Sequence, residues 1–180
     1  FRVERAVGQL DFADFITSVQ LNNDQNQTNG GNPNLVPEQS WDTELVLNSQ
    51  TDWSGPVKLR LYYRAIEDVN DKILIERIVN GDGSISILEG DGNLESATDF
   101  GIEISGTYSL SSLLPGAKVD WFYLLSEQRV DDPITGQTRM LSMIDFDKID
   151  IKFRQDIPNS FWAWGADFLA FRGSGLWRID

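Results

Sequence analysis

The feature that most constrains the fold is a pair of strictly alternating segments, residues 41–48 and 57–65, joined by a short turn. Successive side chains of a strand point to opposite faces of a sheet. In both segments one face is therefore apolar with aromatic ends, through residues such as Trp41, Leu45 and Leu61, and the other face is charged. The fold depends on whether the apolar face meets a protein core or lipid.

The charged face carries acids on the first segment and bases on the second. Opposite charges on neighbouring strands attract when their side chains face each other. We expect a cross-strand ladder on the inner wall of the structure, built from Asp42, Glu44, Lys58, Arg60 and Arg64. Because each exposed pair contributes only about 0–1 kcal/mol, we assign the ladder a structural role.

Two kinds of connection take turns along the chain. The short ones are residues 52–56, 111–116 and 156–160, and the longer polar ones are residues 22–37, 70–95 and 131–138. Outer-membrane barrels keep this order, with short turns on one side and long loops on the other. The later segments repeat the alternation over lengths close to the roughly 9–11 residues of a tilted membrane strand. The sequence therefore predicts an all-β fold, an antiparallel meander of long strands forming part of a transmembrane β-barrel.

Aromatic residues gather near the ends of the expected strands. Such a distribution is typical of the two aromatic girdles of a membrane barrel, although aromatic residues also pack in the cores of soluble sandwiches. We predict interface positions near the long loops for Trp41 and near the short turns for Trp53, Tyr108, Trp121, Trp162 and Trp164.

Composition excludes several functions. The 180 residues include no Cys and no His, so this stretch can build neither a thiolate metal site nor a Ser-His-Asp triad. The net charge of −13 disfavours a nucleic-acid partner, which needs a basic footprint. We expect no catalytic residues and no organic cofactor.

One acidic stretch, residues 67–95, contains the glycine turns Asn80–Ser84 and Gly90–Asn93. Oxygen-rich turns of this kind can hold Ca²⁺. The candidate ligands are Asp82 and Asp91. The stretch departs from an EF-hand loop, because Ile85 occupies the position that needs glycine when Asn80 is taken as the first ligand. Two ordinary glycine turns on a surface are the alternative.

The segment Gly31–Trp41, GNPNLVPEQSW, followed by the alternating residues 42–48, resembles TonB-dependent outer-membrane receptors. That family often carries an NPxLxPExS stretch where an external loop descends into a barrel strand. Residues 9–15 and 61–68 resemble the same family. Pro33 and Pro37 fix φ and prevent regular pairing just outside the strand.

The resemblance implies that residues 1–180 are the C-terminal part of a receptor barrel in the bacterial outer membrane, with the plug domain and the remaining strands outside this stretch. It implies active uptake of a scarce nutrient: a siderophore, a vitamin or a saccharide. The implied partners are outer-membrane lipid, the protein's own plug domain, an inner-membrane energising partner acting through that plug, and a small-molecule or oligosaccharide ligand.

The charge of the chain bears on the ligand, and the strand pattern allows two alternative functions. An acidic external stretch would repel an anionic ferric siderophore, so a neutral or saccharide-like ligand is favoured. A passive porin-type barrel and a soluble β-sandwich binding module are the alternative functions. The sandwich predicts that the apolar face around Leu45, Leu59 and Ile104 is covered by protein.

Overall fold

The strands follow one another as a meander. The computed structural model describes residues 1–11, 18–19, 28–30, 32–51, 55–132, 136–142 and 144–175. Its elements are β1 (Arg2–Val7), β2 (Ser18–Val19), β3 (Thr28–Gly30), β4 (Gln39–Thr51), β5 (Gly55–Val79), β6 (Ile85–Ser109), β7 (Ala117–Asp132), β8 (Gln137–Arg139), β9 (Asp145–Asp156) and β10 (Ala163–Gly173).

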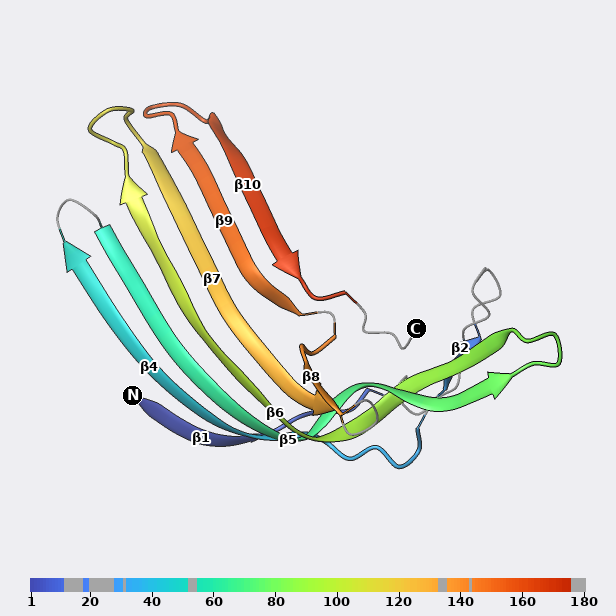
Figure 1. The fold of residues 1–180 in the computed structure, drawn as a ribbon. Helices are drawn as coiled ribbons and strands as arrows, with labels where there is room; N and C mark the ends of the chain where they lie inside the picture. Colours follow the sequence, from blue (N-terminus) through green and yellow to red (C-terminus); the bar gives the residue numbers. More distant parts are fainter. Residues whose placement is uncertain are drawn as a thin grey trace.

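The main path of the sheet has the order β1-β4-β5-β6-β7-β9-β10, and every neighbouring pair in it is antiparallel. Figure 1 shows these strands side by side in one curved layer, with β1 and β10 at opposite edges. Within the described residues β1 and β10 do not pair, so the sheet is open. The predicted all-β, antiparallel meander of long strands is confirmed.

The described residues contain no helix that is long and apolar enough to cross a membrane.

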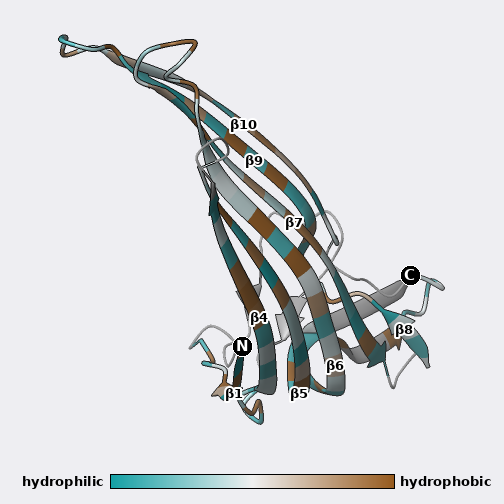
Figure 2. Ribbon diagram, turned by 90° about the vertical axis from the view of Figure 1, so that its left-hand side faces the viewer, coloured by the Kyte–Doolittle hydropathy of each residue, from teal (hydrophilic) through white to brown (hydrophobic). Residues whose placement is uncertain are grey.

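The pairing register separates two faces across the whole sheet. Leu45 lies opposite Leu61, which lies opposite Ile102, and this row belongs to what we call the apolar face. Asp42, Arg64 and Asp99 align in the same way on the other side, the polar face. The alternation of hydrophobic and hydrophilic residues along the strands is visible in Figure 2.

The apolar face has no protein layer over it in the described part of the chain. Large apolar side chains on this face are 37–57% exposed, and they come from β4 through β10: Trp41, Leu45, Leu47, Leu61, Tyr63, Phe100, Ile102, Tyr108, Leu125, Ile149, Ile151, Trp164 and Phe168. A soluble monomer rarely exposes a continuous apolar surface of more than a few hundred Å². This arrangement disagrees with the sandwich alternative, which requires a second sheet on this face.

The short connections lie at one end of the sheet. β6 and β7 are joined by residues 110–116, and β9 and β10 by residues 157–162. In the first turn Leu110 and Ala117 pair through the Leu110 N–H, 2.9 Å from the Ala117 carbonyl oxygen. Gly116 has φ of 76°, and a Cβ there would collide with the backbone carbonyl oxygen of Asp156. The turn therefore requires glycine at this position.

The stretch expected as a long loop at residues 70–95 is instead a β-hairpin, which corrects that prediction. β5 and β6 run on past the sheet as a two-stranded ladder and turn at residues 80–84. We call residues 69–94 the arm. Isoleucine, leucine and valine residues on both sides of a glycine turn favour strands. Figure 1 shows the two green strands leaving the sheet together.

The other long connections also contain strand. β7 continues to Asp132 and pairs with β8, so the expected loop at residues 131–138 is partly a small hairpin. Residues 133–135 lie outside the described part. In the first long connection, β3 pairs in parallel with β6 of the arm, at residues 88–90.

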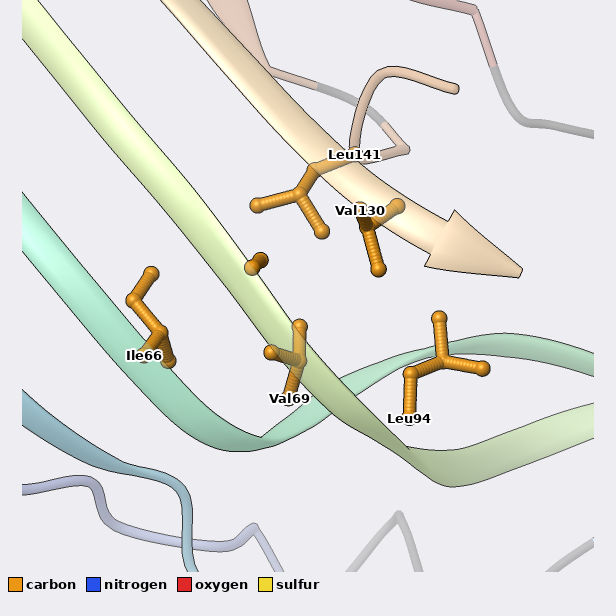
Figure 3. Close-up of a cluster of buried hydrophobic side chains, with 6 residues drawn as sticks. Ile66, Val69, Leu94, Val130 and Leu141 are labelled. Carbon is orange, nitrogen blue, oxygen red and sulfur yellow. The ribbon is translucent and has the colours of Figure 1, made fainter. Parts of the chain in front are cut away.

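The buried apolar cluster lies where the arm leaves the sheet. It consists of Ile66, Val69, Leu94, Ala97, Val130 and Leu141. Leu141 belongs to residues 136–142, which we call the strap. Figure 3 shows Leu141 facing Val130, with Ile66, Val69 and Leu94 around them. The strap thus covers the polar face at its arm end.

Candidate functional site

The polar face of β4, β5 and β6 carries a network of cross-strand ion pairs. Arg60 lies between two carboxylates, with Nε 2.7 Å from Glu44 and Nη1 2.8 Å from Glu103. Four residues further along β5, Arg64 Nε lies 3.2 Å from Asp42 and Arg64 Nη1 lies 3.8 Å from Asp99. The alternating acids and bases of the sequence therefore meet across the strands.

These side chains are between 22% and 34% exposed, apart from Asp99 at 12%. Lys58 belongs to the same face and lies opposite Asn48 and Ser105 near the short turns. The structure thus gathers Asp42, Glu44, Arg60 and Arg64 into one network and places Lys58 at its end. That this face lines a barrel interior stays a prediction.

A buried polar cluster continues the network onto β7. Gln128 is 2% exposed and donates from Nε2 to Asp99 Oδ1 at 3.0 Å and to Ser126 Oγ at 2.7 Å. The hydroxyl of Tyr62 lies 3.5 Å from the same oxygen of Asp99. Gln128 Oε1 has no donor among the described residues. A buried acceptor without a donor is costly.

Four of the predicted interface aromatics, Trp41, Tyr108, Trp121 and Trp164, lie on the apolar face. Trp41 is 53% exposed at the arm end of β4, near Tyr63 and Phe100 in the register. At the other end, Trp121 lies against Gly106, and Tyr108 is the penultimate residue of β6. Two levels of aromatic residues therefore bound the apolar face.

The remaining tryptophans lie at the turn end or outside the described residues. Trp162 is 77% exposed in the turn after β9. Trp164 packs on Phe153 with ring centroids 4.9 Å apart and donates from Nε1 to Gln155 at 2.7 Å. Trp53 lies outside the described residues.

The structure does not bring the two candidate calcium ligands together. Asp82 lies in the turn of the arm, where its carboxylate accepts hydrogen bonds from the Ser84 N–H at 2.9 Å and hydroxyl at 2.6 Å. These bonds hold the pKa of Asp82 below its usual range, the hydroxyl contributing most. Asp91 pairs with Lys72 at 2.7 Å. Six residues of strand, about 20 Å, separate Asp91 from the turn.

Metal ligands are also sparse elsewhere. No group of three or more His, Cys, Asp or Glu side chains suited to a metal ion occurs in the described part. Calcium binding by Asp82 or Asp91 separately stays a prediction.

The most buried ion pairs of the described residues were not predicted from the sequence. Arg139 of the strap is 7% exposed and lies between two carboxylates, 2.6 Å from Asp71 of the arm and 3.1 Å from Asp132 of β7. It also donates to the Lys72 carbonyl oxygen at 3.2 Å. Asp71 and Arg139 are 68 positions apart, so no local pattern signals their pairing.

The proline-rich segment before β4 contacts the opposite side of the arm. The Asn93 side chain exchanges two hydrogen bonds with the Val36 backbone, both 2.9 Å, and donates to the Asp68 carbonyl oxygen at 2.7 Å. Asn32 donates to the Asp91 carbonyl oxygen at 3.2 Å. Asp68 has φ of 55°, and this kink marks where the arm departs from the sheet.

No family model matches the chain, and no curated protein matches it. Among solved structures it is similar to the siderophore receptor PirA of Acinetobacter baumannii, with a TM-score of 0.48 and 19% sequence identity. The match covers 79% of this chain and 20% of the receptor, so the chain spans about one fifth of that protein's length.

Proposed function

We propose that this chain is a stretch of the wall of a bacterial outer-membrane receptor that takes up a scarce nutrient actively. One observation carries the proposal: a continuous apolar face without a protein cover, opposite a face of paired charges, on an open antiparallel sheet. Lipid is the environment that such a face fits, because the hydrocarbon region accepts apolar side chains and the strands between the two edges, β1 and β10, pair their backbones on both sides.

The dimensions of the apolar face support this environment. Phe100 and Tyr108 bound it on β6 and are eight residues apart, about 26 Å along a strand. At a tilt of about 40°, this length spans roughly 20 Å along the membrane normal, close to the roughly 25 Å apolar band of outer-membrane barrels. In the register, Trp41 on β4 lies within two residues of the level of Phe100, and Trp121 on β7 lies within two residues of the level of Tyr108.

Active uptake rather than passive flow is supported by the resemblance of the NPNLVP segment to TonB-dependent receptors. In the structure this segment leads directly into β4 and is anchored to the arm by Asn93, as an external loop entering a barrel strand would be. The ligand we propose is neutral or saccharide-like. The chain is strongly acidic, and this charge disfavours an anionic ligand.

The test uses the full-length protein in its native cell. We expect it in the outer-membrane fraction, with a gel mobility that changes on heating, because closed barrels resist detergent unfolding. Recovery as a soluble monomer without detergent would contradict the proposal. For active uptake, a protonophore should abolish ligand entry; entry that continues at the same rate would instead favour a passive porin.

A further inference from the structure

The arm is a two-stranded hairpin that extends beyond the sheet. An isolated hairpin is at best marginally stable in water. Beyond Val69 and Leu94 the pairing partners along the arm are its own two strands and, over three residues of β6, the short strand β3. A regular ladder that reaches the turn at residues 80–84 therefore needs support at its base.

The base is supported on two sides by segments from distant parts of the chain. On one side is the strap, whose Arg139 joins Asp71 and the Lys72 carbonyl oxygen of the arm to Asp132 of β7. The Ser142 N–H adds a hydrogen bond of 3.3 Å to Asp71. On the other side, Asn93 joins the arm to Val36.

The strap is itself attached to the last strand. Ser174, just after β10, donates from Oγ to the Leu141 carbonyl oxygen at 2.6 Å and accepts a bond of 3.0 Å from the Ile144 N–H. Leu141 is buried in the apolar cluster between the arm and β7. The strap therefore connects the arm, β7 and the end of β10 through buried contacts.

The tip of the arm is ordered by its own hydrogen bonds. The Asn80 N–H lies 2.8 Å from the Ser84 carbonyl oxygen, and the Asn80 side chain donates to the Ser84 hydroxyl at 2.9 Å. Asp82 accepts two further bonds from Ser84. Base and tip are thus both fixed, and a ladder with one register shift, between Leu74 and Glu76, joins them.

We infer that the arm is a rigid element that presents its tip at a fixed position relative to the sheet, and that Arg139 and Asn93 are the two clamps that hold it. The inference goes beyond the proposed function, because it rests on contacts within the chain and needs no membrane. It assigns the strap a conformational role: releasing Arg139 frees the arm.

The experiment measures the distance between the arm tip and the sheet in the full-length protein by pulsed EPR. Other cysteines are removed where present, and spin labels are attached through Gly81→Cys and Arg129→Cys. Gly81 has no neighbouring atoms within 4 Å of an added Cβ, and Arg129 is exposed on β7. Along β6, fourteen residues of strand, at most about 45 Å, separate the tip from Thr98, the residue opposite Arg129. Because a rigid arm holds the two labels at one separation, a single narrow distance distribution is expected.

Arg139→Met should broaden the distribution about twofold, because Asp71 and Asp132 are left buried without their cation. Asn93→Ala should broaden it through the opposite clamp. Arg172→Met is the matched control: it removes an exposed arginine that pairs with Asp147 away from the arm, and it should change nothing. Distributions as narrow as the parent's in both Arg139→Met and Asn93→Ala would overturn the inference.

If Arg139→Met does not fold, Asp71→Asn replaces it, since the amide keeps the shape and removes one charge; an unchanged width in that variant would equally refute the clamp. The heat-dependent gel shift is recorded on every sample. If the parent protein shows no heat-dependent gel shift, the proposed membrane function is contradicted. If the distance distributions of the variants stay narrow, only the clamping role of Arg139 and Asn93 is contradicted.

Discussion

Placing a positive charge at the centre of the apolar face should destabilise the protein in a way that depends on depth. Ile104 on β6 is four residues, about 13 Å, from both Phe100 and Tyr108, and it lies between Leu59 and Tyr123 on the neighbouring strands. In a bilayer this is the midplane position. Arginine on the lipid face there costs about 2–4 kcal/mol, falling to about 0–1 kcal/mol near the interfaces.

Three variants separate charge, depth and face. Ile104→Arg should lower the free energy of unfolding by about 2–4 kcal/mol, and Thr98→Arg, on the same face but near the arm end, by about 0–1 kcal/mol. Ser105→Arg changes the adjacent residue on the polar face and should cost under about 1 kcal/mol, because exposed charges interact weakly. Ile104→Gln reports the loss of the apolar side chain without the charge.

The assay is reversible unfolding of the full-length protein in lipid vesicles by guanidinium chloride, with the free energy obtained by linear extrapolation. The reasoning fails if Ile104→Arg and Thr98→Arg cost the same, because a lipid environment makes the cost follow depth. It also fails if Ser105→Arg is the most damaging of the three, because the polar face would then be the one in hydrocarbon.

Three further outcomes follow from local geometry. Gly116→Ala should destabilise the protein by about 1–3 kcal/mol through its left-handed backbone and the collision with Asp156, whereas Gly81→Ala, with open space around it, should be close to neutral in the same unfolding assay. Arg60→Met should cost about 1 kcal/mol; a double-mutant cycle with Glu44→Gln checks it, and zero coupling would show that the 2.7 Å pair is not formed in solution. Calorimetry with Ca²⁺ should show no tight site that needs both Asp82 and Asp91, because they lie far apart on the arm; a strong heat that either Asp→Asn variant abolishes would contradict this separation.

The two faces of the sheet were predictable because a period of two residues can be read directly from the sequence. That pattern fixes which side chains of β4, β5 and β6 share a face, and it therefore placed Glu44 and Arg60 on the same side of the sheet. The arm was not recognised, since its acids and glycines resemble a loop while Ile73, Ile78 and Val79 carry the strand signal. The Arg139 contacts were beyond local reasoning, because they join residues nearly 70 positions apart.

The cross-strand pairs have a consequence for folding that same-strand pairs do not. On β7 and β9 some charges pair within one strand, Lys118 with Asp120 and Lys152 with Asp150, and such pairs survive any shift between strands. On β4, β5 and β6, Arg60 reaches Glu44 and Glu103 on two different strands.

A shift of one residue would turn every side chain of a strand to the opposite face. For β5 it would place Arg60 among Leu45 and Ile102 on the apolar face and leave two carboxylates without a cation. Among the described residues no second protein layer lies on the apolar face, so none there can correct a wrong register. The charge network and the apolar face therefore specify the register together, and two of the three strands that carry the network, β5 and β6, also form the arm.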